Sequence, residues 1–82
     1  MHRVTGRYVF SQDVVLTVKT EAGRLYVQEN KEPRQELLPE SPETFYSANS
    51  SDEYSFRLPK DGFAEVMVLH ADGKDLEIRR EP

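Results

Sequence analysis

The chain has 82 residues, a length that supports one small domain with a thin hydrophobic core. Its 11 Lys and Arg against 15 Asp and Glu give a net charge of −4, and the arginines are dispersed among acidic residues. Nucleic-acid binding favours a continuous basic surface, so no nucleic-acid partner is expected. There is no cysteine, which excludes disulfides and thiolate metal sites.

The longest uninterrupted apolar run has only four residues, Val66 to Leu69. A transmembrane helix needs about 20 apolar residues, and a signal peptide needs an apolar stretch of about 7–15. We therefore expect neither a membrane span nor a signal peptide in this chain. If a longer parent protein is exported, its signal lies upstream of Met1.

Short segments rich in β-branched and aromatic residues alternate with clusters of turn-forming residues along the whole sequence. The clusters recur about every 8–12 residues, which is typical of all-β sandwiches and barrels. Taken in chain order, the pattern predicts eight strands at residues 5–10, 14–20, 24–30, 34–38, 43–48, 53–58, 63–70 and 74–80.

Alternation within these segments predicts antiparallel strands with one buried and one solvated face, as for Val14, Leu16 and Val18 on one side of their segment. No helix covers the apolar faces, so the sheet has to bury them against itself. The sequence therefore predicts one all-β domain over residues 1–82. Its expected form is a small eight-stranded antiparallel up-and-down (lipocalin-like) barrel, with a strongly twisted half-barrel as the alternative.

The stretch LLPESPETFY joins the fourth and fifth segments and carries two prolines. Proline fixes φ and lacks an N–H donor, so it suits a corner better than the middle of a sheet. We expect a structural corner in which Leu37 and Phe45 point inward and Pro39 and Pro42 stiffen the turn.

The aromatic residues divide between the two faces. Five are expected to point inward and fill the barrel: Tyr8, Phe10, Phe45, Tyr54 and Phe56. Tyrosine is enriched at protein interfaces. We therefore expect a possible docking patch on the outside, formed by Tyr26, Tyr46, Val66 and Val68. The segment from Glu65 to His70 is apolar on both faces, which suggests a bulge, a covered outer patch or a weak homodimer contact.

The order of several short motifs resembles a known family. They are Gly6-Arg7-Tyr8, Gly23 to Val27, Leu37 to Ser41, Tyr54 to Phe56, and Val68 to His70 followed by Gly73. Their succession is similar to the small lipocalin-like β domain found C-terminal to beta-lactamase-like (penicillin-binding-protein-type) serine hydrolases.

This resemblance implies a non-catalytic accessory domain that packs on a serine-hydrolase domain, in cis or in trans, and shapes substrate access. It also implies a bacterial parent enzyme, which would place the chain in the periplasm or outside the cell. Catalysis in that family uses a Ser-x-x-Lys motif in the preceding domain. No serine in this chain is followed by lysine three residues later.

Other chemistries have weak support in the sequence. Ser55, Asp72 and Asp75 are possible partners of His70, but a histidine at a strand end is expected to be a partly exposed turn residue without a catalytic role. His2 and His70 are the only histidines, so neither a metal nor a cofactor site is expected. The many glutamates are expected to be solvated.

Two alternatives to the accessory domain stay open. One is a free-standing barrel that binds an apolar ligand at its mouth, or another protein. The other is a self-contained enzyme.

Overall fold

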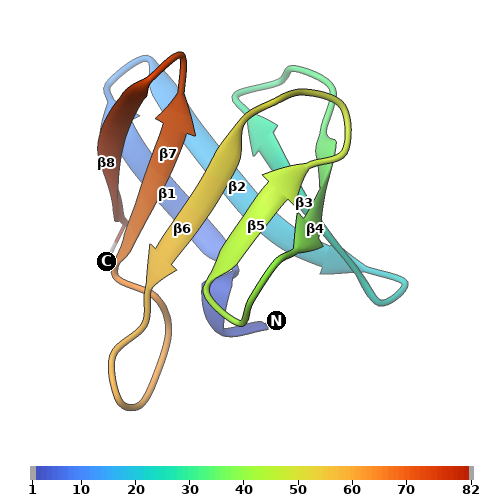
Figure 1. Ribbon diagram of the computed structural model, residues 1–82. Helices are drawn as coiled ribbons and strands as arrows, with labels where there is room; N and C mark the ends of the chain where they lie inside the picture. Colours follow the sequence, from blue (N-terminus) through green and yellow to red (C-terminus); the bar gives the residue numbers. More distant parts are fainter. Residues whose placement is uncertain (1, 82) are drawn as a thin grey trace.

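The structure is a computed structural model that describes residues 2–81. It is a closed barrel of eight antiparallel strands in sequence order, preceded by a short 3₁₀ helix (Figure 1). The elements are η1 (His2–Val4), β1 (Gly6–Ser11), β2 (Val14–Glu21), β3 (Arg24–Glu29), β4 (Gln35–Pro39), β5 (Thr44–Ser47), β6 (Glu53–Arg57), β7 (Val66–Ala71) and β8 (Lys74–Arg80).

Pairing between the first and last strands closes the barrel. Tyr8 of β1 lies opposite Arg80 of β8, and Val9 lies opposite Arg79. All the remaining pairs join strands that are consecutive in the chain. The predicted all-β, eight-stranded, up-and-down barrel is therefore confirmed, and the half-barrel alternative is wrong because this last pairing leaves no open edge.

Two of the hairpins turn through residues with positive φ. Ala22 and Gly23 have φ values of 54° and 79° between β2 and β3, and Asp72 and Gly73 have 52° and 73° between β7 and β8. Two consecutive positive φ values are typical of type I′ turns, whose twist matches that of the flanking strands. The Asp72-Gly73 sequence is therefore the hairpin turn between β7 and β8.

The two ends of the barrel differ. One end, here called the open end, carries the β1–β2, β3–β4, β5–β6 and β7–β8 connections (Figure 1). The other, the closed end, is covered by η1 and by the connection between β6 and β7. The Tyr8 hydroxyl donates to the Val4 carbonyl at 2.7 Å, and the Ala64 amide donates to the Arg3 carbonyl at 2.7 Å. These bonds hold the N-terminal turn across the interior.

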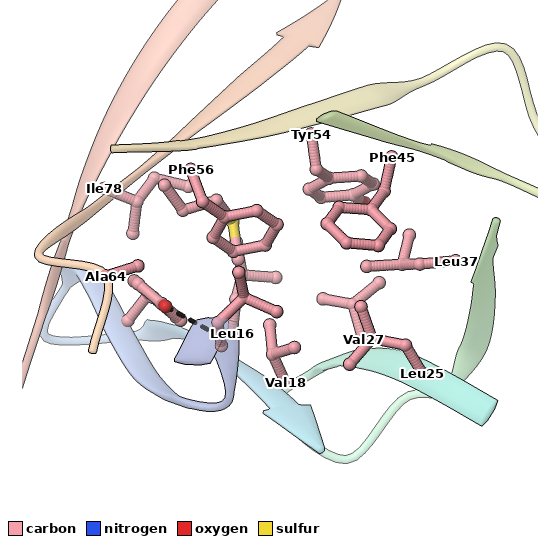
Figure 2. Close-up of a cluster of buried hydrophobic side chains, with 13 residues drawn as sticks. Leu16, Val18, Leu25, Val27, Leu37, Phe45, Tyr54, Phe56, Ala64 and Ile78 are labelled. Carbon is pink, nitrogen blue, oxygen red and sulfur yellow. Dashed lines mark hydrogen bonds between the residues drawn. The ribbon is translucent and has the colours of Figure 1, made fainter. Parts of the chain in front are cut away.

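The core is one continuous cluster of side chains that alternate inward along the strands (Figure 2). Phe56 lies near its centre, with ring centroids 5.8 Å from Tyr8 and 5.7 Å from Phe45, the latter in an edge-to-face arrangement. The buried cluster comprises Val4, Tyr8, Leu16, Val18, Leu25, Val27, Leu37, Phe45, Tyr54, Phe56, Ala64, Met67 and Ile78.

Predicted and observed strand ends agree to within one residue except at the start of the seventh strand, and the inward placement of Phe10 is wrong. Phe10 is 49 % exposed, because a register shift between Val9 and Ser11 ends the regular alternation of β1. The seventh strand begins at Val66 and not at residue 63, because Ala64 is drawn into the core beside η1 and bonds to Arg3. Phe63 remains largely exposed in the preceding connection.

Candidate functional site

A pocket of roughly 530 Å³ occupies the open end of the barrel, here called the mouth pocket. Its apolar lining comes from inward-facing residues near the ends of three strands: Leu16 of β2, Val27 of β3 and Leu69 of β7. The core below is filled by aromatic rings, so the pocket is confined to the mouth (Figure 2). Volumes of about 300–1,000 Å³ are typical of small-molecule sites.

The rim of the mouth pocket is acidic. Glu29, Glu32 and Asp52 line it, and none of these three carboxylates forms an ion pair within residues 2–81. The single arginine on the rim, Arg34, is 2.7 Å from Glu21. Its guanidinium also lies 3.9 Å from the ring centre of Tyr26, so its charge is engaged away from the three rim carboxylates.

Tyr54 provides a polar group at the base of the mouth pocket. The residue is only 5 % exposed and lines the pocket, and its hydroxyl makes no hydrogen bond to any residue in the described part of the chain. Burial, with smaller contributions from Asp52 and Glu29, raises the pKa of Tyr54 to about 12. The hydroxyl is therefore protonated at neutral pH and can donate one hydrogen bond and accept others.

Hydrogen bonds fix the loops that carry the rim. The Asn30 side chain accepts from the Val15 amide at 3.0 Å and donates to the Asp13 carbonyl at 2.9 Å, which ties the β3–β4 connection to the β1–β2 hairpin. On the other side, the Ser47 amide donates to the Asp52 carbonyl at 3.0 Å. The acidic rim is therefore held on a braced scaffold.

The lining of the mouth pocket indicates which class of ligand it can bind. An apolar lining favours a hydrophobic body, the carboxylates favour a positive charge, and the Tyr54 hydroxyl supplies one oriented hydrogen bond. No group of three or more metal-ligating side chains is present among the described residues. The matching ligand is therefore an amphipathic organic cation, such as an amine on an aromatic or aliphatic body.

Sequence reasoning did not find this site, because it assigned the glutamates to solvated turns. A signal was nevertheless present. In an up-and-down barrel, the connections that follow odd-numbered strands all meet at one end. Glu29, Glu32 and Asp52 lie at the end of β3, in the β3–β4 connection and in the β5–β6 connection, so the topology gathers them.

The structure changes the expected docking patch. Tyr26 and Tyr46 face outward, Tyr46 is 40 % exposed, and Val68 is half-buried. Val66 also faces outward but is only 5 % exposed, so the expectation of an exposed valine at this position is wrong. It lies between Arg57 and Arg79 in the ladder, and an ion pair from Arg57 to Glu77 crosses β7 beside it.

The expected corner lies between β4 and β5. Leu37 and Phe45 are buried, and Pro39 lies opposite Phe45 at the end of β4. Pro42 is exposed in the turn itself. The Ser41 hydroxyl oxygen accepts from the Thr44 amide at 3.1 Å, which closes the turn.

The structure also brings together three residues from β6, β7 and β8: Ser55, His70 and Asp75. His70 lies on β7, where its imidazole bonds to the Ser55 hydroxyl on one side and the Asp75 carboxylate on the other. Asp72 lies in the adjacent turn, and no hydrogen bond or ion pair joins it to His70.

Comparison with protein-family models, with curated proteins and with solved structures returned no match for this chain. The likeness to the lipocalin-like domain of serine hydrolases therefore remains a prediction. Within residues 2–81, no helix has the length and apolar character needed to cross a membrane.

Proposed function

We propose that this protein is a small-ligand binding module whose mouth pocket takes an amphipathic organic cation. The observation that carries the proposal is Tyr54, a largely buried tyrosine that lines the mouth pocket and whose hydroxyl forms no hydrogen bond with another described residue. No buried side-chain oxygen or nitrogen lacks a partner among the described residues, so this hydroxyl is open to the solvent in the pocket. A bound ligand can therefore take its hydrogen bond in place of water.

The charges around Tyr54 support a cation. Asp52 and Glu29 lie close enough to raise its pKa, so negative potential extends into the pocket. The two rim glutamates and Asp52 lack ion-pair partners among the described residues. An ammonium group at the rim would interact favourably with all three, while its apolar body displaced water from Leu16, Val27 and Leu69.

Three probes of one shape test the proposal: 2-phenylethylamine, the neutral 2-phenylethanol and the anionic 3-phenylpropanoate. We expect the amine to perturb NMR signals of mouth-pocket residues at lower concentration than the alcohol, and the anion to leave them unchanged. Asp52→Asn should remove most of the preference for the amine over the alcohol. Asp61→Asn is the matched control, because Asp61 is an exposed residue of the β6–β7 connection at the closed end.

Equal binding of all three probes, or amine-induced shifts confined to residues outside the mouth pocket, would refute the proposal. If 2-phenylethylamine saturates the response of Tyr54→Phe at the same concentration as that of the wild type, the Tyr54 hydroxyl does not bond to the ligand and this part of the proposal is wrong.

The accessory domain of a serine hydrolase is the second candidate. It rests on the family resemblance and on Tyr46, an exposed aromatic residue opposite the half-buried Leu38 on the outer face of the barrel. Its partner would be a penicillin-binding-protein-type catalytic domain, and Tyr46→Ser should weaken the association. An adjoining reading frame that lacks Ser-x-x-Lys, or a parent enzyme unaffected by deletion of this domain, would argue against it.

A further inference from the structure

Ser55, His70 and Asp75 form a continuous hydrogen-bonded chain on the outer face of the barrel. The Ser55 Oγ is 2.9 Å from His70 Nε2, and His70 Nδ1 is 2.7 Å from Asp75 Oδ1. The three residues come from the adjacent strands β6, β7 and β8. Ser55 faces outward because Tyr54 and Phe56 on either side face the core.

The register of the sheet produces this arrangement. Ser55 lies opposite Val68, two residues before His70 on the same face, so Ser55 and His70 are diagonal neighbours. Asp75 lies directly opposite His70 across the β7–β8 hairpin. The short Asp72-Gly73 turn fixes that pairing, so the Asp75–His70 contact is set by the hairpin itself.

The Asp75 contact also sets the tautomer of His70. An ionised carboxylate can only accept hydrogen bonds, so Nδ1 carries the proton and donates it to Asp75. In the neutral ring Nε2 is then an acceptor, and the Ser55 hydroxyl donates to it. A hydroxyl that donates to an imidazole, which is oriented by a carboxylate, is the arrangement that activates serine nucleophiles on unrelated folds.

The hydrogen-bonded group of Ser55, His70 and Asp75 is accessible to solvent. The side chain of His70 is 35 % exposed, and Ser55 is half-buried. A shallow hollow of roughly 340 Å³ lies beside His70, lined by Ser51, His70, Lys74 and Asp75 together with the turn at 71–73. On the other side, Thr44 is the cross-strand neighbour of Ser55, and its hydroxyl can donate a hydrogen bond to an oxygen near Ser55. Arg57, two residues along β6 on the same face, is ion-paired with Glu77 at 2.6 Å.

We propose that Ser55 is a nucleophile toward small, activated carboxylic esters, with His70 as general base and Asp75 as a positioning residue. The Ser55 oxygen forms a bond to the ester carbonyl carbon, and its proton moves to His70 Nε2. The bond from that carbon to the leaving oxygen breaks, and the leaving group departs with the electron pair and takes up the proton from His70 Nε2, which restores the neutral imidazole. Water then attacks the acyl-serine, assisted by His70, which releases the carboxylic acid and restores Ser55.

The test is incubation of the folded protein with 4-nitrophenyl acetate, with nitrophenolate release followed by absorbance and the acetylated residue located by mass spectrometry. We expect a single acetyl group on Ser55. Ser55→Ala should abolish this modification, and His70→Gln should slow it about 100-fold, the lower range for loss of a general base. Asp75→Asn should slow it about 10-fold, less than for a buried triad because the Asp75 side chain is 69 % exposed.

The controls separate chemistry from folding. Asp72 lies in the same hairpin and forms no hydrogen bond or ion pair with His70, and Asn tolerates the positive φ at this position, so the acetylation rate of Asp72→Asn should equal that of the wild type. Ser51→Ala removes a hydroxyl that lines the hollow but is not bonded to His70, and it should also have no effect. Thermal unfolding of each variant by circular dichroism verifies that the barrel is intact.

The positioning role of Asp75 has its own measurement. The ¹⁵N spectrum of the His70 ring should show the Nδ1–H tautomer in the wild type and a mixture of tautomers in Asp75→Asn. If wild-type Ser55 is not acetylated faster than Ser51, the three residues only tie the strands together and the proposal is wrong. That result would leave the mouth pocket unaffected, because Ser55, His70 and Asp75 do not line it.

Discussion

The guanidinium group of Arg80 occupies the space in which a side chain at Gly6 would lie. Gly6 also has a φ of 143°, a conformation that other residues rarely adopt. Arg80 faces the closed end, donates to the Thr5 carbonyl and lies 4.6 Å from the ring centre of Phe63. A charged side chain thus closes this end of the barrel, and the missing side chain at Gly6 makes room for it.

Gly6→Ala should therefore destabilise the barrel strongly. The backbone strain costs about 1–3 kcal/mol, and displacement of the Arg80 guanidinium, which loses its hydrogen bond to Thr5, costs a further ~1 kcal/mol. Gly23→Ala is the matched control, because Gly23 has a φ of 79° but no atom within 4 Å of the added carbon, so only the strain of about 1–2 kcal/mol applies. Urea unfolding measures both, and equal losses would contradict the steric role of Arg80.

Phe56→Ala should destabilise the protein much more than Phe10→Ala. Phe56 packs against two other rings in the core, and its removal should cost about 3–5 kcal/mol. Phe10 is largely exposed, and its removal should cost less than about 1 kcal/mol. Comparable losses in denaturant unfolding would show that Phe10 is also part of the core.

Tyr8→Phe should lower the free energy of unfolding by about 1–2 kcal/mol, because the buried Val4 carbonyl loses its donor. The ring itself is retained, so the packing around Phe56 should change little. Hydrogen exchange should accelerate first at Ala64, whose amide bonds to Arg3 beside the N-terminal turn. Unchanged exchange there would mean that the Tyr8 hydroxyl does not hold η1 in place.

Stability should fall in alkaline solution, in part through Tyr54. The pKa of Tyr54 rises from 10.0 to about 12 on folding, so the folded state holds the proton more tightly than the unfolded state. The resulting stabilisation is fully present below about pH 10 and is lost as the pH rises through about 12. Tyr54→Phe should make the unfolding free energy less dependent on pH in this range. An unaltered pH dependence would contradict the shift.

The strand pattern could be predicted from sequence because alternation and turn residues are local properties of the chain. Val14, Leu16 and Val18 show one face of a strand without reference to any other segment, and Asp72-Gly73 marks its own turn. Phe10 was placed wrongly because a register shift depends on the partner strand. The burial of Val66 depends on its neighbours in the folded sheet, Arg57 and Arg79, so its own strand could not predict it.

The sequence alone determined eight antiparallel strands and a core filled by aromatic and aliphatic side chains, because residues that alternate every second position can bury only one face of each strand. Only the tertiary structure decided that β1 pairs with β8 to close the barrel, and where on it chemistry is possible. Cross-strand register joined Ser55, His70 and Asp75, and barrel closure gathered the rim carboxylates around Tyr54. Contacts of this kind depend on distances between strands, and no local pattern in the chain encodes those distances.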